Sequence, residues 1–213
     1  MRFSILYEEL KFSDVFSAAS PEEVAVRKKK HLEVEIADLK KTKLQDGTWQ
    51  IHADLIISSS QVNSLDGLNV SIVDEDFYCS YNYLTSLVGC PKKIGKDFNC
   101  TLNQLTSLKG CPSEVGHSFD CSWNKPLTSL VGCPNVIEGD FSCGENGLYD
   151  LVGAPERVGR DFICSNNKGL TSLEGCPKFV GRHFYCKNLK EGVFTEEDVR
   201  AICHVEGSVR FKE

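Results

Sequence analysis

The stretch from Asp97 to Val115, DFNCTLNQLTSLKGCPSEV, is one copy of a unit that the chain repeats six times between Asp76 and Asn188. In each copy a cysteine lies two positions after a phenylalanine. In five copies an asparagine lies five positions after the same phenylalanine. A fixed period of 21 or 22 residues is typical of stacked supersecondary units, so the sequence predicts an array of coils and not a closed globule. The six phenylalanines are Phe77, Phe98, Phe119, Phe141, Phe162 and Phe184.

The repeated residue types have predicted places inside the array. Side chains two apart on a strand point to the same side, so phenylalanine and cysteine should form one large and one small interior column. The asparagines should satisfy backbone groups where the chain leaves the strand. They are Asn82, Asn103, Asn124, Asn146 and Asn167.

All eleven cysteines lie at or beyond Cys79, and ten belong to the repeat. Four of them precede a proline, and Ala154 holds that place in the fourth copy. Because alanine is accepted there, we interpret the cysteines as small apolar groups that stay reduced. Disulfides between neighbouring strands are the alternative. A zinc cluster is less favoured, because no CxxC pair occurs.

Charge and hydropathy exclude some classes of protein. The net charge of −6 argues against a dedicated nucleic-acid binder. No apolar run approaches the ~20 residues needed to span a bilayer. The first residues, MRFSILYEELKF, carry charges where a signal peptide needs an apolar core. We therefore expect a cytoplasmic protein, in the host cytoplasm if it is viral, with no membrane partner.

Residues 1–54 are predicted to form an N-terminal helix and β-hairpin cap. Ser20-Pro21-Glu22-Glu23 has the residues of a helix start. The segments Leu32–Ile36 and Trp49–Leu55 alternate apolar and polar residues as half-exposed strands do, and Asp46-Gly47 predicts a turn between them. Such a hairpin would cover the first open edge of the array.

The array itself is predicted over residues 55–190, followed by a C-terminal cap over 191–213. The first coil is degenerate, because Leu55 and Ile57 have the spacing of a phenylalanine and cysteine. In the C-terminal cap, Thr195 should start a helix that runs from about Glu196 to Cys203. A short strand, Ser208 to Phe211, should follow, and His204 between them is interpreted as structural.

The unit F-x-C-S-x-N-x-L-T-S-L-x-G-C-P-x-x-V-G resembles the leucine-rich repeat, L-x-x-L-x-L-x-x-N-x-L. Phe98, Cys100, Asn103 and Leu105 fall on its strand leucines, its asparagine and its next leucine. The repeat sequence is also similar to that of repeat proteins of large tailed bacteriophages and some bacteria. The resemblance covers about Leu55 to Asn188. It implies an α/β-class right-handed solenoid with a parallel sheet on the concave face, a mostly non-helical convex side and small α/β caps at both ends.

The side chains that flank phenylalanine and cysteine should point outward from the concave face. Several are aromatic and fall on consecutive copies, beside a column of aspartates that we interpret as solvated charges, with cation binding as the alternative. Exposed aromatic side chains anchor protein interfaces. The alternative is that the N-terminal segment or solvent covers them. The predicted partner-binding residues are Tyr78, Tyr81, Tyr83, Leu102, Asp120, Trp123, Glu145, Ile163 and Tyr185.

The basic residues mostly lie between proline and phenylalanine, on the predicted convex side. The separate run Arg27–Lys30 is interpreted as the cationic end of a helix, with nucleic-acid binding as the alternative. The convex set is Lys92, Lys93, Lys96, Arg157, Arg160, Lys178 and Arg182.

Outside the repeat columns no serine, cysteine or histidine set suggests a nucleophile and base, and no phosphate loop occurs. We therefore expect no catalytic or metal-binding residues and no cofactor. The leading hypothesis is a non-enzymatic protein–protein interaction module of a bacteriophage or bacterium, which captures or inhibits a host protein through its concave aromatic and acidic face. The alternative is nucleic-acid or anionic-surface binding through the convex side and Arg27–Lys30. Homo-oligomerisation through an uncapped end or the concave face is left open.

Overall fold

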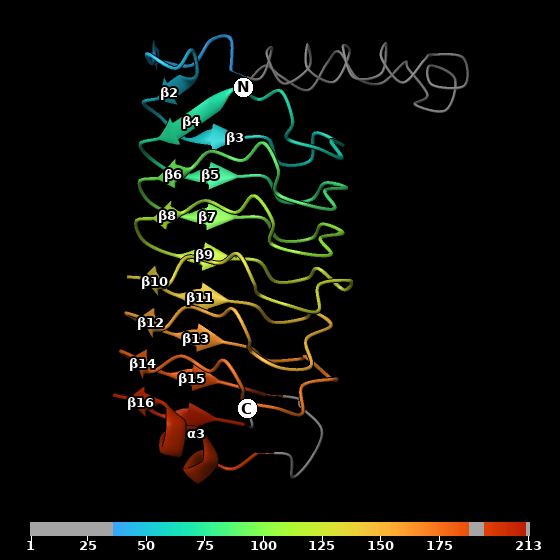
Figure 1. The fold of residues 1–213 in the computed structure, drawn as a ribbon, viewed down its shortest axis with the longest axis vertical. Helices are drawn as coiled ribbons and strands as arrows, with labels where there is room; N and C mark the ends of the chain where they lie inside the picture. Colours follow the sequence, from blue (N-terminus) through green and yellow to red (C-terminus); the bar gives the residue numbers. More distant parts are fainter. Residues whose placement is uncertain (1–35, 188–193, 212–213) are drawn as a thin grey trace, which may run out of the picture.

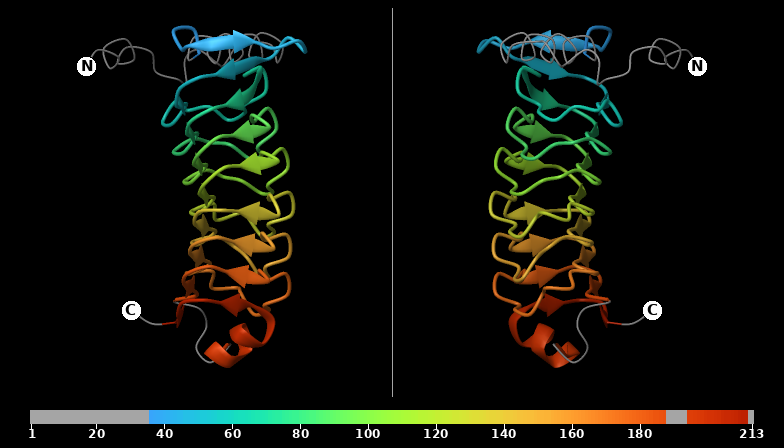
Figure 2. Two further views of the ribbon diagram at one scale, coloured as in Figure 1. Left: turned by 90° about the vertical axis from the view of Figure 1, so that its left-hand side faces the viewer. Right: turned by 90° about the vertical axis from the view of Figure 1, so that its right-hand side faces the viewer.

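The computed structural model describes residues 36–187 and 194–211. They form a parallel β-solenoid of about seven coils with very little helix, which confirms the predicted repeat fold (Figure 1). The coils stack in a nearly straight column in both side views of Figure 2. The predicted helix that starts at Ser20, the segment 32–35 and the basic run Arg27–Lys30 lie outside the described residues.

One sheet runs the whole length of the solenoid, and we call it the long sheet (Figure 1). Its strands pair in parallel, and consecutive phenylalanines are direct partners, as Phe98 and Phe119 are. This is the face that the sequence analysis calls concave. Its eight strands are β3 (Leu55–Ile56), β5 (Phe77–Tyr78), β7 (Phe98–Asn99), β9 (Phe119–Asp120), β11 (Phe141–Ser142), β13 (Phe162–Ile163), β15 (Phe184–Tyr185) and β17 (Val209–Arg210).

A second face of the solenoid carries two shorter sheets. The chain alternates between the long sheet and this face once per coil, from β5 to β6 to β7 for example. The first of these sheets holds β1 (Lys41–Lys43), β2 (Trp49–Ile51), β4 (Val70–Val73), β6 (Lys93–Ile94) and β8 (Glu114–Val115). The other holds β10 (Val136–Ile137), β12 (Arg157–Val158), β14 (Phe179–Val180) and β16 (His204–Val205).

The core is a single file of rings along the solenoid axis. All six repeat phenylalanines are at most 1% exposed, and neighbouring ring centroids lie 4.9–5.7 Å apart. The cysteines two residues further on are equally buried, as predicted. The degenerate first coil is also confirmed, because Leu55 pairs with Phe77 and both Leu55 and Ile57 are buried.

The strands of the long sheet are only two residues long, and this corrects the sequence analysis. The predicted outward positions assumed that a strand continues past the cysteine to residues such as Tyr81 and Tyr83. Instead the chain turns a corner at Tyr81, whose φ is 55°. A second corner lies at the repeat glycine. Gly110 has a φ of +86°, and a Cβ there would lie 2.6 Å from the Leu87 backbone.

Both caps are partly as predicted. The hairpin turn at Asp46-Gly47 is present, but the strand that pairs antiparallel with β2 is β1, not the segment Leu32–Ile36. The predicted strand Trp49–Leu55 is divided in the structure. Strand β2 ends at Ile51, and Leu55 begins β3 of the long sheet. At the other end α3 (Glu196–Ile202) begins with Thr195 and Asp198 in the predicted reciprocal capping arrangement.

All eleven cysteines are free thiols. Among the described residues no group of His, Cys, Asp or Glu could hold a metal ion. In the same part of the chain, no helix has the length and apolarity to cross a membrane.

Candidate functional site

Two columns of outward side chains run along the long sheet. The first, which we call the strand column, consists of the second residue of each strand, in direct register from coil to coil. Since the preceding phenylalanine points into the core, this residue points out. Its members are Ile56, Tyr78, Asn99, Asp120, Ser142, Ile163, Tyr185 and Arg210.

The second column, the corner column, lies where each coil leaves the long sheet. Its residues have φ values between 54° and 63°, in the left-handed region that bulky side chains avoid. Backbone hydrogen bonds hold the corners in line, as when the Trp123 N–H donates to the Gly144 carbonyl oxygen over 3.1 Å. The column consists of Ser59, Tyr81, Leu102, Trp123, Glu145 and Asn166.

The two aromatic side chains of the corner column are exposed. Tyr81 is 62% exposed and Trp123 is 48% exposed. Tyr83, on the segment after the corner, is 54% exposed. The Lys125 ammonium lies 5.4 Å from the Trp123 ring centroid and 2.8 Å from Glu145 Oε2. These side chains therefore form an aromatic rim beside the strand column.

On the other side of the strand column, the aspartates are not simply solvated charges. The side chain of each ladder residue accepts the backbone N–H of the equivalent residue in the next coil, over 2.9–3.2 Å. This corrects the predicted free column, because one oxygen of each carboxylate is used by the fold. The ladder consists of Asp54, Asp76, Asp97, Ser118, Asp140, Asp161 and His183.

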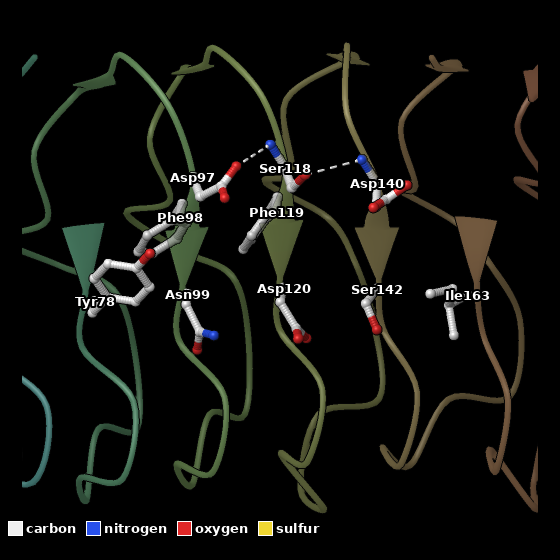
Figure 3. Close-up of a pocket in the computed structure, with 10 residues that line it drawn as sticks. All are labelled: Tyr78, Asp97, Phe98, Asn99, Ser118, Phe119, Asp120, Asp140, Ser142 and Ile163. Atoms are coloured by element: carbon white, nitrogen blue, oxygen red, sulfur yellow. Dashed lines mark hydrogen bonds between the residues drawn. The ribbon is translucent and has the colours of Figure 1, made fainter. Parts of the chain in front are cut away.

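Between the ladder and the corners, the middle of the strand column is hollowed into an open groove of about 360 Å³ (Figure 3). Asn99, Asp120 and Ser142 are short side chains that stand next to one another on its floor. Tyr78 lines one end and Ile163 the other. The groove is open because the longer side chains of the column lie at its two ends.

The ionisable groups of the groove are perturbed. The hydroxyl of Tyr78 donates to Asp76 Oδ2 over 2.9 Å, and this hydrogen bond, with burial, raises the pKa of Tyr78 to about 12. Burial also raises the pKa of Asp120, which hydrogen bonds from Ser122 and Ser142 only partly offset. Asp120 is thus a half-buried carboxylate at the centre of the face.

The structure divides the predicted partner-binding residues into three groups. Tyr78, Asp120, Ile163 and Tyr185 lie in the strand column, and Tyr81, Leu102, Trp123 and Glu145 lie in the corner column, while Tyr83 stands apart on the next segment. Asn99 and Ser142 are not among the predicted residues, although both share the phase of Tyr78 in the repeat.

The basic residues of the opposite face are largely paired with carboxylates. Lys93 lies 2.8 Å from Glu114, Lys178 lies 3.1 Å from Glu156, and Lys96 pairs with Glu75. Arg160 and Arg182 reach back to Asp140 and Asp161 of the ladder, over 3.7 and 3.8 Å. These two arginines belong to the edge of the long sheet and not to the predicted convex patch.

No protein-family model, no curated protein and no solved structure matches this chain. The resemblance to leucine-rich repeats therefore stays a prediction.

Proposed function

We propose that the protein is a non-enzymatic binding module that holds another protein against the long sheet and its aromatic rim. The single observation that carries the proposal is that Tyr81, Leu102 and Trp123 occupy left-handed corners on consecutive coils. A bulky residue in this conformation costs about 1–2 kcal/mol. Asn166 has the same conformation in a later coil, and asparagine tolerates it well. The backbone conformation of these corners therefore disfavours tryptophan and tyrosine.

The dimensions of the face suit a protein partner. Eight strands at a spacing of ~4.8 Å give a face about 34 Å long. One side of a standard protein interface covers about 800 Å² and has aromatic anchors near its centre. Trp123 lies on the middle coils of the described array. The rim and strand column together supply such a surface.

The buried repeat cysteines and the ladder carboxylates give no support to catalysis. Burial raises the pKa of the thiols of Cys79, Cys100 and Cys121, which disfavours the thiolate that a nucleophile needs. Each ladder carboxylate that accepts a backbone N–H has a structural role.

On the resemblance alone, we further propose that the partner is a host protein of a bacteriophage or bacterial repeat protein, that binding inhibits it, and that the two meet in the host cytoplasm. The alternative, nucleic-acid binding through the other face, has less support, because Lys93, Lys96 and Lys178 are paired with glutamates. A net charge of −6 also opposes phosphate binding.

Affinity capture with the double variant Tyr81→Asn and Trp123→Asn tests the proposal. Removing two anchors should lower partner recovery at least about 10-fold, because one hot-spot side chain is worth about 2 kcal/mol or more. Asparagine suits the corner backbone, so the melting temperature should stay the same or rise. Tyr149→Asn is the matched control, since Tyr149 is also 62% exposed but lies outside both columns. Equal recovery by the double variant and the control would refute the proposal.

A further inference from the structure

Two positions of the strand column, one near each end, carry the same residue in different surroundings. Tyr78 and Tyr185 are both the second residue of a long-sheet strand, and both are half-buried. The aspartate ladder runs past both. The repeat therefore places one tyrosine in two nearly equivalent positions, which can be compared within one molecule.

At the C-terminal end, the chain's own cations cover the tyrosine. Arg210 is the partner of Tyr185 on the next strand, and its guanidinium carbon lies 5.2 Å from the ring centroid. The Lys187 ammonium lies 5.9 Å from the same centroid. Arg182 lies 3.8 Å from Asp161 of the ladder. The Tyr185 ring and the Asp161 carboxylate thus each have a cationic side chain close by.

At the N-terminal end, the equivalent place has no cation. The partner of Tyr78 on the next strand is Asn99, which is short and neutral. The groove beside them is lined by Asp97, Asp120 and Asp140, and by no lysine, arginine or histidine of the described residues (Figure 3). His117 reaches Asp97 and Arg160 reaches Asp140 from outside the lining, which leaves Asp120 as the carboxylate without a cationic partner in the described part of the chain.

Asp120 also carries a charge that its structural role does not need. Its Oδ1 accepts the backbone N–H of Ser122 over 2.9 Å. In the preceding coil Asn99 accepts the backbone N–H of Thr101 in the same way, over 3.0 Å. An asparagine at 120 would keep this bond, whereas burial of the aspartate raises its pKa and opposes its ionisation.

We propose that the groove between Tyr78 and Asp120 receives an arginine side chain from an extended basic segment of the protein partner. The guanidinium stacks on the Tyr78 ring, as that of Arg210 does on Tyr185, and its N–H groups donate to the Asp120 carboxylate. A planar fork of donors fits this combination of ring and carboxylate better than an ammonium does. This inference rests on the proposed function and names the chemistry of the partner.

The test uses fluorescence anisotropy of a labelled peptide of alternating arginine and serine, with a peptide of alternating glutamate and serine as the negative probe. The full chain should bind the arginine peptide saturably and leave the glutamate peptide unbound. Asp120→Asn should weaken binding at least about 10-fold, because a charge-assisted pair is lost. Asp150→Asn is the matched control. The Asp150 carboxylate likewise accepts a backbone N–H two residues on, from Val152 over 3.0 Å, but lies outside the groove.

A second variant supplies the missing cation from the chain itself. Asn99→Arg puts an arginine where Arg210 stands relative to Tyr185, so it should fill the groove and abolish peptide binding. Tyr149→Arg adds the same guanidinium at an exposed position outside the groove, and should bind within about 2-fold of the unsubstituted chain. If Asn99→Arg does not fold, Asp120→Asn still decides, because it retains the backbone hydrogen bond.

Unchanged binding by Asp120→Asn would overturn the proposal. So would a concentration-dependent dimer, detected by sedimentation, that Asn99→Arg dissolves, because a second copy would then occupy the groove. Partner capture that depends on Trp123, with no binding of the arginine peptide, would leave the proposed function intact and remove this inference. Binding of the arginine peptide, with partner capture that does not depend on Trp123, would refute the proposed function and leave the inference about the groove intact.

Discussion

At the scale of single residues, the buried asparagines hold neighbouring coils together. Asn124 is fully buried, and its amide nitrogen donates to the carbonyl oxygens of Cys121 in its own coil and Cys100 in the preceding coil, over 3.0 and 3.2 Å. Its side-chain oxygen accepts the Leu105 N–H over 3.1 Å. A buried turn leaves these backbone groups without water, so each needs a protein partner. One side chain thus serves two coils.

We expect Asn124→Ala to lower the free energy of unfolding by about 3 kcal/mol or more, because each buried polar group left without a partner costs about 1–3 kcal/mol. Asn135→Ala, at an exposed asparagine, should change it by less than about 0.5 kcal/mol. Urea unfolding of the two variants measures the difference. A loss below about 1 kcal/mol for Asn124→Ala would mean that water replaces the amide.

At the scale of elements, the ladder secures the start of each long-sheet strand. The strands are only two residues long, so few hydrogen bonds within the sheet hold any one of them. In the ladder, Asp97 Oδ1 accepts the Ser118 N–H over 2.9 Å and lies 2.6 Å from His117 Nδ1. Burial opposes ionisation of Asp97, but the hydrogen bonds from Ser118 and His117 outweigh it and lower the pKa of this carboxyl.

This shift makes the stability depend on pH. A carboxyl whose pKa is lower in the folded state stabilises the fold above its unfolded pKa, near 3.8, and loses that contribution as the pH falls through the folded pKa. We therefore expect Asp97→Asn to be less stable than the full chain at pH 7, and the gap to shrink at pH 3 and below. Urea midpoints at both pH values check this. A gap that is constant with pH would show that the charge of Asp97 contributes nothing.

At the scale of the whole molecule, stability is distributed along one axis. Each coil contacts mainly its neighbours, so the interior is a continuous column and the array behaves as a one-dimensional stack. Phe119 lies in the middle, with ring centroids 4.9 Å from Phe98 and 5.5 Å from Phe141. The exposed features, the rim and the groove, stand on these same middle coils.

Removing the central ring should open the column locally. Phe119→Ala should cost about 3–5 kcal/mol, and amide hydrogen exchange should rise most strongly between Phe98 and Phe141. The exposed Trp123→Ala is the control and should leave exchange in these coils almost unchanged. An increase of equal size along the whole solenoid would indicate a single cooperative core instead of a stack.

Much of the molecule follows from the sequence because its signals are local or periodic. The spacing of phenylalanine and cysteine predicts the interior columns, and Thr195 with Asp198 predicts the start of α3. The boundaries of the N-terminal hairpin were predicted less well, because Trp49–Leu55 alternates like one strand but is divided between two faces of the solenoid.

The sequence predicts which side chains of the candidate site point outward, but not how they are arranged. The repeat predicts that Tyr78, Tyr81 and Trp123 point outward. In the structure Tyr81 and Trp123 are exposed, and Tyr78 is half-buried where it lines the groove. The sequence does not show that the chain turns at Tyr81 and Trp123, because these corners are held by hydrogen bonds to the following coil. The sequence alone therefore predicts one continuous face where the structure has a separate rim and groove.

The sequence by itself determined that this chain is a stack of coils with a phenylalanine file inside. The fixed period is typical of stacked units, and side chains two apart on a strand lie on the same side. Only the tertiary structure decided that the strands stop after two residues, that the aspartates bond to the next coil, and that Asp120 lies without a cation in a groove. The physical reason is that these features depend on contacts between coils, about 21 residues apart in the chain, which no local pattern encodes.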